Sequence, residues 1–369
     1  MINILHINTT KGWRGGDIQM LTTYNLLSKK SDLQQFIFCP QDSKMAGVLR
    51  KLHIPHVSAR QRYKLSPRYL IHLDNLIRAQ SIHIVHAHDS YALALALILS
   101  RFHWGLKIIY SRKRNNIIPN KYYKTIKYNS PRLTKIVCVS EAVNKVFDGI
   151  LTEPRKLTVI YDAIDVESFS NAQPNGFLHA QHNLPADTFL IGNVAALTAQ
   201  KDLYTFLDAA KMIIESSDKK IAFFIVGEGE LKAELQTYAI KNNIDQQVIF
   251  TGYRDDIQKI LPEFDLLMIS SETEGLPLTL MEAFASKVAV VATDAGGVSE
   301  AIQHQVTGML SPIKDSAALA KNALQLMVDE PLRQKVIDAA FELVRNKFSL
   351  PIMAENYYQL YTGVAQQGD

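Results

Sequence analysis

The chain alternates short apolar runs with segments of helical periodicity along its whole length. Short apolar runs predict buried strands, and the stretches between them, with apolar positions about every 3.6 residues, predict helices. Expected strands in the first half lie at residues 2–7, 36–39, 82–86, 107–110, 136–140 and 157–160. Those in the second half lie at 189–194, 221–226, 247–251, 266–270, 288–293 and 308–310. Strands that alternate with helices favour α/β architecture with parallel, doubly wound sheets.

The strands form two successive series, which predict two Rossmann-like domains facing across a cleft, with ligands outside the carboxyl ends of the strands. A chain of 369 residues also exceeds what one hydrophobic core usually supports. We expect an N-terminal domain at 1–165, a linker at 166–185, rich in Asn, Gln, Pro and Gly, and a C-terminal domain at 186–350.

Charge is distributed unevenly between the two halves. Residues 1–165 hold 25 Lys and Arg against 10 Asp and Glu, whereas the remainder holds 15 against 26. No acidic residue occurs between Ser90 and Ser140, and basic residues are dense over 101–135. Such a stretch is typical of attraction to polyanions, namely nucleic acid, anionic lipid headgroups or phosphorylated glycolipids, although a solvated charged face is the alternative. We expect 101–135 to contact an anionic membrane surface, and not nucleic acid.

Segments that would place the chain in or across a membrane are not apparent. The longest apolar run, 91–99, is too short to span a bilayer. The chain opens on a predicted strand, without the basic and apolar regions of a signal peptide. Cys39 and Cys138 both lie in apolar, strand-like runs, as buried thiols in a reducing compartment do. We therefore expect a cytoplasmic protein, peripheral at the inner face of the membrane.

Two carboxylates, Glu274 and Glu282, are eight residues apart where a predicted strand gives way to a helix. A Gly-Leu-Pro break separates the strand from the helix. One carboxylate therefore falls at the carboxyl end of a strand, and the other lies about one turn into the helix, beside free backbone N–H groups. Such an arrangement can hold a polyol while the helix N-terminus faces an anion. A nucleotide sugar has both chemical features.

This segment resembles the E-x7-E signature of the retaining glycosyltransferases of the GT-B fold, family 4. Glycine-containing segments at 252–257, before this pair, and at 295–300 and 307–310, after it, occur in the same order as in that family. The resemblance covers nearly the whole chain. The stretch 161–169 is similar to the family's interdomain hinge, with Asp162 and Ala163 where Asn-Gly is usual. The resemblance also implies that the terminal helix, 351–369, packs back on the first domain.

The resemblance implies a metal-independent enzyme without a cofactor, which moves a sugar from a nucleoside-diphosphate sugar to a glycolipid or oligosaccharide acceptor with retention of configuration. Synthesis of bacterial cell-surface polysaccharide or lipopolysaccharide is the implied setting. Glu282 would bind the ribose hydroxyls and Glu274 the hydroxyls of the donor sugar. The remaining implied donor contacts in this half of the chain are Arg254, Leu276, Pro277, Leu278 and Thr279.

Lys201 is the candidate for the donor phosphates, since the segment 191–202 resembles the family's G-R-L-x3-K-G loop. A lysine there would neutralise the pyrophosphate as it becomes a leaving group. The arginine of the family is replaced by Ala196, so either Arg254, Arg112 or Lys113 takes its place, or activity is reduced. An exposed helix-capping lysine is the alternative interpretation of Lys201.

Two further candidates lie in the first half. The glycine-rich segment 11–17 lacks the P-loop pattern. A glycine turn before a helix still exposes N–H groups to an anion, and similarity to the family's Gly-Gly loop assigns Gly15 and Gly16 to the pyrophosphate; a plain tight turn is the alternative. Strand alternation puts His86 and His88 on one side, which leaves a metal site or a core or capping histidine open. The family parallel assigns His88 to the sugar or the acceptor.

Two other classes of function remain open. A nucleotide-sugar epimerase of the same fold would need acid and base carboxylates at the sugar and no acceptor surface, which the basic first half does not favour. A non-catalytic polyanion- or lipid-binding protein would leave Glu274 and Glu282 without a role. Incubation with nucleotide sugars separates the three classes by transfer or hydrolysis, by isomerised sugar, or by lack of turnover.

Overall fold

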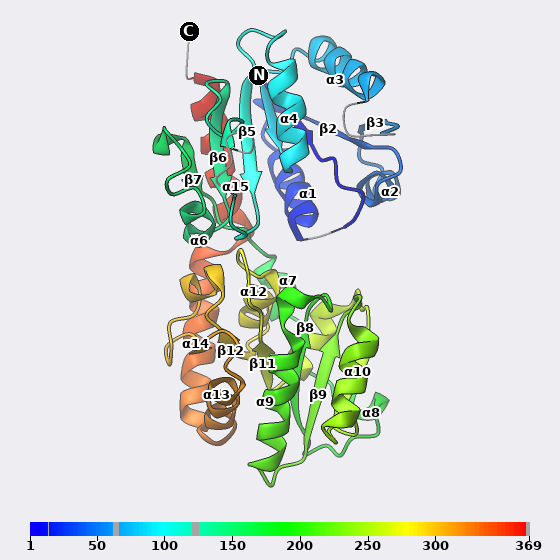
Figure 1. Cartoon of the computed structure of the whole chain (residues 1–369), viewed down its shortest axis with the longest axis vertical. Coiled ribbons are helices and arrows are strands. Elements are labelled where there is room, and N and C mark those ends of the chain that lie inside the picture. The colour runs from blue at the N-terminus through cyan, green and yellow to red at the C-terminus, as the bar shows by residue number, and fades with distance from the viewer. Residues whose placement is uncertain (14, 62–65, 120–124, 367–369) are drawn as a thin grey trace. The chain divides into compact units, whose positions relative to one another are not determined.

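The computed structural model describes residues 1–13, 15–61, 66–119 and 125–366. The chain forms two compact units (Figure 1). Unit 1 comprises Met1–Asp162 with Leu350–Asp369, and unit 2 comprises Ala163–Ser349. We propose that these units are the two domains expected from the sequence.

Unit 1 contains a parallel sheet with the strand order β3-β2-β1-β4-β5-β6-β7. The strands are β1 (Ile2–Ile7), β2 (Leu33–Pro40), β3 (Val57–Ala59), β4 (Ile84–Ala87), β5 (Lys107–Arg112), β6 (Leu133–Cys138) and β7 (Leu157–Val159). The helical segments are α1 (Gly15–Leu27), α2 (Lys44–Lys51), α3 (Pro67–Ala79), α4 (Ser90–Leu99), α6 (Glu141–Lys145), η1 (Pro154–Lys156) and α15 (Leu350–Gln366). The order runs outward in both directions from β1 and β4, which is the doubly wound arrangement.

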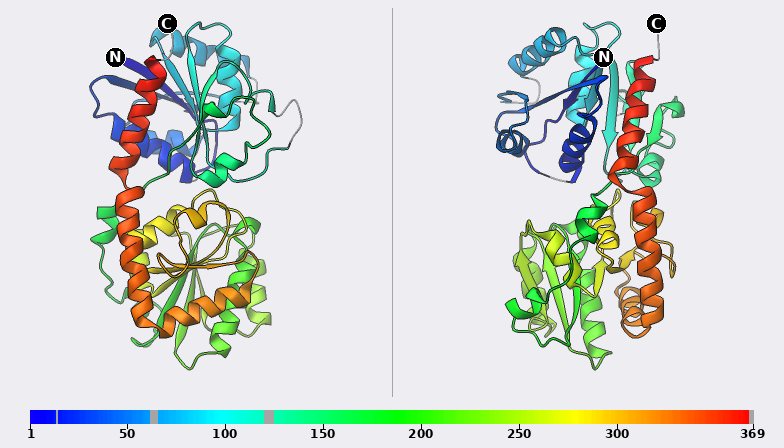
Figure 2. Two further views of the ribbon diagram at one scale, coloured as in Figure 1. Left: turned by 90° about the vertical axis from the view of Figure 1, so that its left-hand side faces the viewer. Right: turned by 180° about the vertical axis from the view of Figure 1, so that it is seen from behind.

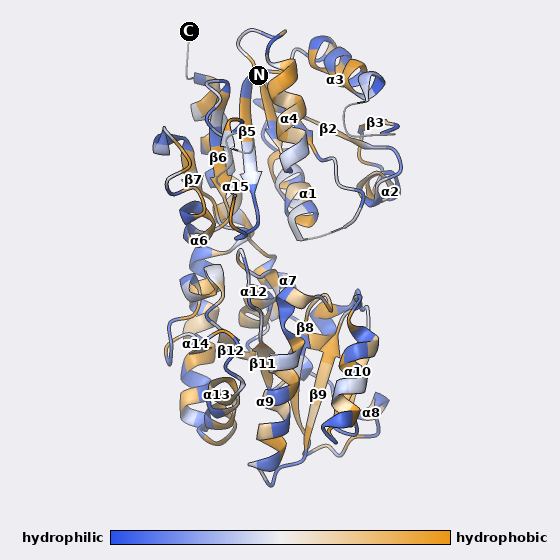
Figure 3. Cartoon of the chain, viewed as in Figure 1, coloured by the Kyte–Doolittle hydropathy of each residue, from blue (hydrophilic) through white to orange (hydrophobic). Residues whose placement is uncertain are grey.

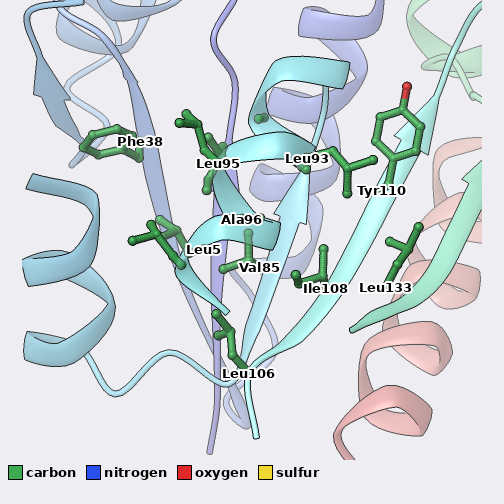
Figure 4. Close-up of a cluster of buried hydrophobic side chains, with 14 of the residues drawn as sticks. Leu5, Phe38, Val85, Leu93, Leu95, Ala96, Leu106, Ile108, Tyr110 and Leu133 are labelled. Atoms are coloured by element: carbon green, nitrogen blue, oxygen red, sulfur yellow. The ribbon is translucent and has the colours of Figure 1, made fainter. Parts of the chain in front are cut away.

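The two faces of this sheet differ in chemistry because side chains alternate along each strand. Leu5 and Val85 point into the apolar cluster that α3 and α4 cover, and Figure 4 shows them beside Leu93 and Ala96 of α4. The intervening residues carry histidines to the opposite face, where α1 and α15 pack against each other. Unit 1 therefore has one apolar face and one face with a buried polar cluster.

Unit 2 contains a second parallel sheet, of order β10-β9-β8-β11-β12-β13. Its strands are β8 (Phe189–Val194), β9 (Ile221–Val226), β10 (Val248–Gly252), β11 (Leu266–Ile269), β12 (Ala289–Thr293) and β13 (Met309–Ser311). Strand β9, which pairs with β10 on one side and β8 on the other, is buried along its whole length and hydrophobic throughout (Figure 3). This is the expected pattern for a parallel strand covered by helices on both faces.

The helices of unit 2 enclose that sheet, with α9 and α13 packed against each other over one face. The helical segments are α7 (Val166–Ser170), α8 (Phe177–Gln181), η2 (Ala199–Lys201), α9 (Leu203–Glu215), α10 (Lys232–Lys241), α11 (Ile257–Ile260), η3 (Leu261–Glu263), α12 (Leu278–Ala285), η4 (Gly296–Glu300), α13 (Ser316–Val328) and α14 (Glu330–Lys347). Gly192 in β8 is required by packing, because a Cβ there would lie 2.1 Å from Cε2 of Phe264.

The last helix of the chain belongs to the first unit. Helix α14 ends unit 2, and α15 follows it after two residues, as the orange and red ribbons of Figure 2 show. In α15 the buried residues Met353, Tyr357, Tyr361 and Val364 recur at helical spacing and form the face that packs on unit 1. Among the residues that the structure describes, no helix has both the length and the apolar character needed to cross a membrane.

Candidate active site

The predicted site residues all follow strands at the carboxyl edge of one sheet or the other. Gly15 and Gly16 follow β1, and His88 follows β4, where the strand order of unit 1 reverses. In unit 2 the order reverses between β8 and β11, and Lys201 and Glu274 follow these two strands. Open α/β sheets bind ligands at this point, because the connections on its two sides leave in opposite directions.

Lys201 and Glu274 form an ion pair across the crossover point of unit 2. Nζ of Lys201 lies 2.5 Å from Oε1 of Glu274, and that oxygen also accepts a hydrogen bond from Oγ of Ser271 at 2.6 Å. The side chains retain 19% and 9% of their exposure. The fold thus brings together two residues that are 73 positions apart in the sequence. The sequence predicted that both bind the donor, but not that they contact each other.

Backbone contacts hold the two loops that carry this ion pair. Oγ of Ser270 donates to the Lys201 carbonyl at 3.0 Å, and the Glu272 N–H donates to the Gln200 carbonyl at 2.9 Å. The turn after β9 supports the first loop, since the Leu197 N–H donates to the Glu228 carbonyl at 3.0 Å. The positions of Lys201 and Glu274 are therefore set by the sheet and not by the ion pair alone.

Helix α12 begins four residues after Glu274 and has no side-chain cap at its N-terminus. Leu276 and Pro277 are buried and lead into the helix, and Pro277 at its N-cap makes no side-chain capping bond. Leu278 and Thr279 begin the helix, so their N–H groups are among those without an acceptor inside it. Such a terminus can bind an anion.

Glu282 lies one turn further along α12. Burial raises the pKa of its carboxyl to about 7, from an ordinary value of 4.5. No hydrogen bond or ion pair to this carboxylate is found among the described residues. A partly buried carboxylate of this kind gains most from a ligand that donates hydroxyl groups to it.

The basic residues considered as substitutes for the missing arginine are already engaged. Arg254 contacts the carboxylate of Asp256 through two nitrogens, at 2.8 and 2.6 Å. Arg112 is buried and donates to the carbonyls of Arg114 and Asn116. Ala196 itself is exposed, so its loop has room for a longer side chain.

Lys113, the third candidate, forms an ion pair with Asp162, its Nζ 2.5 Å from Oδ1. Its aliphatic stem also passes the start of α1, where a Cβ on Gly16 would lie 3.4 Å from Cγ of Lys113. Gly15 is exposed, and both glycines belong to the first turn of α1. The glycine segment is therefore the N-terminus of a 13-residue helix, which can bind an anion through its backbone.

Three histidines gather on the polar face of unit 1: His6 from β1, His86 from β4, and His88 just beyond β4. Nδ1 of His6 lies 3.0 Å from Nε2 of His88, and Nε2 of His6 lies 3.0 Å from Oε1 of Gln35. Burial lowers the pKa of His6 to about 4, and the pKa values of His86 and His88 fall well below 6.5 for the same reason. The rings are therefore uncharged near neutral pH.

Sequence reasoning found His86 and His88 but missed His6 and Gln35. The available signal was a histidine inside the apolar run of β1, in the same register as His86 on the adjacent strand. The three histidines offer nitrogens within 4.8 Å of one another, a spacing that a metal could use. Each ring nitrogen except Nδ1 of His88 already has a side-chain partner, including Tyr361 and Ser111 for His86, so hydrogen bonds account for the cluster.

The basic stretch 101–135 does not form one surface. Arg112, Lys113 and Arg114 lie at the carboxyl edge of the sheet, where β5 ends. Lys107, Arg132 and Lys135 instead line a cavity of about 530 Å³ where β5 and β6 begin, together with Arg155 and Lys156. The aromatic residues Phe102 and Trp104 next to that cavity are 67% and 91% exposed. Residues 120–124 of the stretch lie outside the described residues.

Comparison with known proteins gives two family matches that together cover most of the chain. The model described as Glycosyltransferase Family 4 matches residues 25–168, and the model described as Glycosyl transferases group 1 matches residues 175–343. A UDP-Gal:alpha-D-GlcNAc-diphosphoundecaprenol alpha-1,3-galactosyltransferase of Escherichia coli is 27% identical over 291 residues, 75% of this chain and 73% of that protein. An N-acetyl-alpha-D-glucosaminyl L-malate synthase of Bacillus anthracis is 25% identical, over 77% of this chain and 76% of its own length.

Solved structures show the same fold over nearly all of the chain. Anabaena Alr3699/HepE, in complex with UDP and glucose, aligns with a TM-score of 0.85 at 18% identity, covering 98% of this chain and 100% of that one. The lipopolysaccharide outer core galactosyltransferase WaaB aligns with a TM-score of 0.74 at 16% identity, covering 98% and 99%. The architecture is therefore that of the GT-B fold, with two Rossmann-like units.

Proposed function

Because the chain belongs to the group 1 glycosyltransferases, family 4, we propose that it moves a sugar from a nucleoside diphosphate to a glycolipid or oligosaccharide acceptor, with retention of configuration and without a metal. The observation that carries this proposal is the Lys201–Glu274 ion pair, which lies at the crossover point of unit 2 and next in sequence to the uncapped start of α12. A cation, a carboxylate and free N–H groups are what a diphosphate and a sugar together require.

Each predicted residue then has a chemical task. Glu282 accepts hydrogen bonds from the ribose hydroxyls, and Glu274 accepts them from the donor sugar. Lys201 and the N–H groups at the starts of α12 and α1 bind the diphosphate, the latter through Gly15 and Gly16. Arg254 contributes positive potential, and His88 contacts the sugar or the acceptor. Binding would require Lys201 and Glu274 to exchange their mutual contact for contacts to the ligand.

The transfer we propose is a front-face substitution. The acceptor hydroxyl oxygen bonds to the anomeric carbon on the side from which the diphosphate leaves, so configuration is retained. The bond from that carbon to the diphosphate oxygen breaks, and the hydroxyl proton passes to the departing phosphate. Positive charge at the sugar and negative charge on the diphosphate develop together, which makes the cationic side chain of Lys201 most valuable in the transition state.

The comparisons favour particular substrates to test first. HepE was solved with UDP and glucose, and the Escherichia coli relative uses UDP-Gal and an acceptor on diphosphoundecaprenol. We therefore propose a UDP-sugar as donor and a lipid-linked sugar as acceptor, in the synthesis of bacterial cell-surface polysaccharide or lipopolysaccharide. No nucleic acid partner is proposed.

For the membrane, we propose peripheral association at its cytoplasmic face. Within 101–135, the bases at the amino edge of the unit 1 sheet support this better than those at the carboxyl edge. Arg101 and Lys107 lie close in sequence to exposed Phe102 and Trp104, and basic residues beside exposed aromatic side chains suit an anionic membrane interface. Arg112 and Lys113 have hydrogen-bond partners within unit 1.

The proposed function is tested by incubating the purified protein with a panel of UDP-sugars and a lipid-linked sugar acceptor. Release of UDP with transfer of an α-linked sugar from an α-linked donor is the expected result. An isomerised donor without UDP release would establish the epimerase instead. Failure to bind any nucleoside diphosphate by calorimetry would exclude both enzymes and leave a polyanion-binding protein.

A further inference from the structure

A chain of hydrogen bonds in unit 1 runs from α1, through β2 and β1, to the carboxyl end of β4. Nε2 of Gln35 lies 2.9 Å from the Tyr24 carbonyl oxygen, and Oε1 of Gln35 lies 3.0 Å from Nε2 of His6. Nδ1 of His6 then lies 3.0 Å from Nε2 of His88. The chain ends at Nδ1 of His88, which is buried and has no hydrogen-bond partner among the described residues.

The Tyr24 carbonyl fixes the direction of this chain. A backbone carbonyl oxygen can only accept, so the atom of Gln35 that faces it must be the amide nitrogen. The opposite orientation would put two oxygen acceptors 2.9 Å apart. The amide oxygen of Gln35 therefore faces His6, and because this oxygen can only accept, Nε2 of His6 must carry the proton.

The protonation of His6 in turn determines that of His88. A neutral imidazole with a proton on Nε2 has an unprotonated Nδ1. Nδ1 of His6 therefore accepts, and Nε2 of His88 donates to it. His86 does not determine this pattern, because its two nitrogens contact the hydroxyls of Tyr361 and Ser111, which can donate or accept.

We propose that the Gln35–His6–His88 relay holds His88 in the tautomer protonated on Nε2, so that Nδ1 is an unprotonated acceptor for a hydroxyl group of the bound substrate. Gln35 and His6 are positioning residues in this scheme, since they act through His88. The assignment of a substrate hydroxyl to His88 rests on the proposed function, whereas the tautomer does not.

The unpartnered Nδ1 is what connects the relay to a ligand. A buried acceptor without a donor costs about 1–3 kcal/mol, so proteins rarely retain one without a reason. His88 follows β4, at the point where the strand order reverses and ligands of such sheets bind. A donor such as a sugar hydroxyl satisfies this nitrogen, whereas a group that can only accept, such as an anion, does not. The relay thus selects for hydrogen-bond donors at this position.

Nitrogen NMR of the full-length protein, labelled with 15N-histidine, reads the tautomer directly. We expect the His88 signals to show an unprotonated Nδ1 and a protonated Nε2 at neutral pH, with assignment from the spectrum of His88→Gln. A proton on Nδ1 of His88 in the unaltered protein overturns the proposal, whether or not any variant folds.

The relay itself is tested with Gln35→Leu, which removes the oxygen that fixes His6. His6 can then carry its proton on Nδ1 and donate to His88, so the protonated Nδ1 form of His88 should appear. The matched control is Gln34→Leu, the same change at the exposed neighbouring position of β2, which should leave the spectrum unaltered. An unchanged His88 tautomer in Gln35→Leu overturns the relay.

Kinetics connect the tautomer to the substrate. Loss of one neutral hydrogen bond corresponds to about a threefold to tenfold fall in kcat/KM for transfer in Gln35→Leu, with nucleoside diphosphate affinity retained. Normal kcat/KM with an altered tautomer would exclude the substrate contact. If the unaltered protein transfers no sugar while His88 has the expected tautomer and responds to Gln35→Leu, the relay stands and the proposed function fails.

Discussion

Nζ of Lys201 lies 2.5 Å from Oε1 of Glu274, so the two residues expected to bind opposite ends of a donor also contact each other. Each charged group replaces part of the hydration that the other loses through burial at this edge of the sheet. A diphosphate and a sugar hydroxyl would replace these partners with equivalent ones. The ion pair therefore satisfies two mostly buried charges at this edge of the sheet.

This pairing predicts different outcomes for stability and for catalysis. Lys201→Met should lower turnover by roughly a hundredfold, as for loss of one transition-state charge contact. It should also lower the free energy of unfolding by about 2 kcal/mol, because Glu274 is left largely buried without its partner. In Lys201→Met/Glu274→Gln most of the stability should return, but not the turnover. Chemical denaturation and a transfer assay measure the two effects.

A neighbouring ion pair supplies the control. Lys314 lies 3.1 Å from Glu272, but their side chains are 65% and 36% exposed. Lys314→Met should therefore change the free energy of unfolding by less than about 1 kcal/mol and leave turnover unaltered. If Lys201→Met had normal turnover, the donor phosphates would have to be held elsewhere.

Nucleoside diphosphate binding should depend on pH through Glu282. Burial raises the pKa of the Glu282 carboxyl to about 7, whereas ribose hydroxyls that donate to it favour the ionised form. Below about pH 7 the carboxyl must therefore lose a proton when the ligand binds. Affinity should rise with pH up to about 7, by at most about tenfold per pH unit, and level off above it. Calorimetry at several pH values measures this directly.

The terminal phosphate of the ligand also titrates, near pH 6, and a variant separates the two contributions. Glu282→Gln should lose only the part due to the protein and should bind more weakly at pH 8. Glu342→Gln, at an exposed position of α14, should behave as the unaltered protein. An identical pH dependence in Glu282→Gln would remove this residue from the nucleotide site.

Restoring the missing arginine should increase activity. Ala196 is exposed two residues after the end of β8, so Ala196→Arg can place a second positive charge in the connection that carries Lys201. We expect turnover to rise, on the order of tenfold, with a smaller change in KM. Ala199→Arg, at the exposed first residue of η2 in the same connection, is the control for charge alone. Equal gains in both would indicate general electrostatic attraction and not leaving-group stabilisation.

Membrane binding should depend on the amino edge of the unit 1 sheet. Vesicles with anionic lipid should bind the protein at low ionic strength and release it as salt increases. Arg101→Glu/Lys107→Glu should weaken binding, since each base near the surface contributes about 1 kcal/mol. Trp104→Ala should weaken it at all salt concentrations. Cosedimentation with anionic and neutral vesicles measures these effects.

Arg114→Glu is the comparison variant, because Arg114 is exposed but lies at the carboxyl edge. It should leave vesicle binding unaltered. Loss of binding in this variant, with none in Arg101→Glu/Lys107→Glu, would move the membrane contact to the carboxyl edge. Equally poor binding to both kinds of vesicle would favour an acceptor that is not in a membrane.

Sequence periodicity predicted the strands that are buried on both faces. The bounds of β1, β8 and β9 agree with the expected runs, because parallel strands covered by helices are mostly apolar even where single polar residues such as His6 and Asn193 interrupt them. It missed β3, since Val57–Ala59 is a three-residue edge strand with one exposed valine and no apolar run to mark it. Strand β6 begins three residues before the expected position, because Leu133 packs in the core beside polar neighbours.

The site was predictable as a set of positions but not as a set of contacts. Motif spacing and resemblance proposed Lys201, Glu274 and His88. The doubly wound topology explains why Lys201 and Glu274 follow adjacent strands of one sheet and why His88 follows a strand where the order of the other sheet reverses. The partners of these residues depend on side-chain geometry across the sheet. Gln35 precedes His88 by more than fifty residues and belongs to no recognised motif. Only the folded chain therefore shows that the two residues are connected through His6.

The docking of α15 on unit 1 has a consequence for the order of synthesis. The hydroxyl of Tyr361 contacts Nδ1 of His86 at 2.7 Å, and the two residues are separated by 275 positions. A ribosome makes chains from the amino end, and domains generally fold as they emerge. The sheet of unit 1 therefore emerges first, yet Nδ1 of its buried His86 lacks the Tyr361 hydroxyl until helix α15 is released, although Nε2 can already contact Ser111. Unit 2 can complete its fold earlier, so the half of the protein that is made first is the half that is finished last.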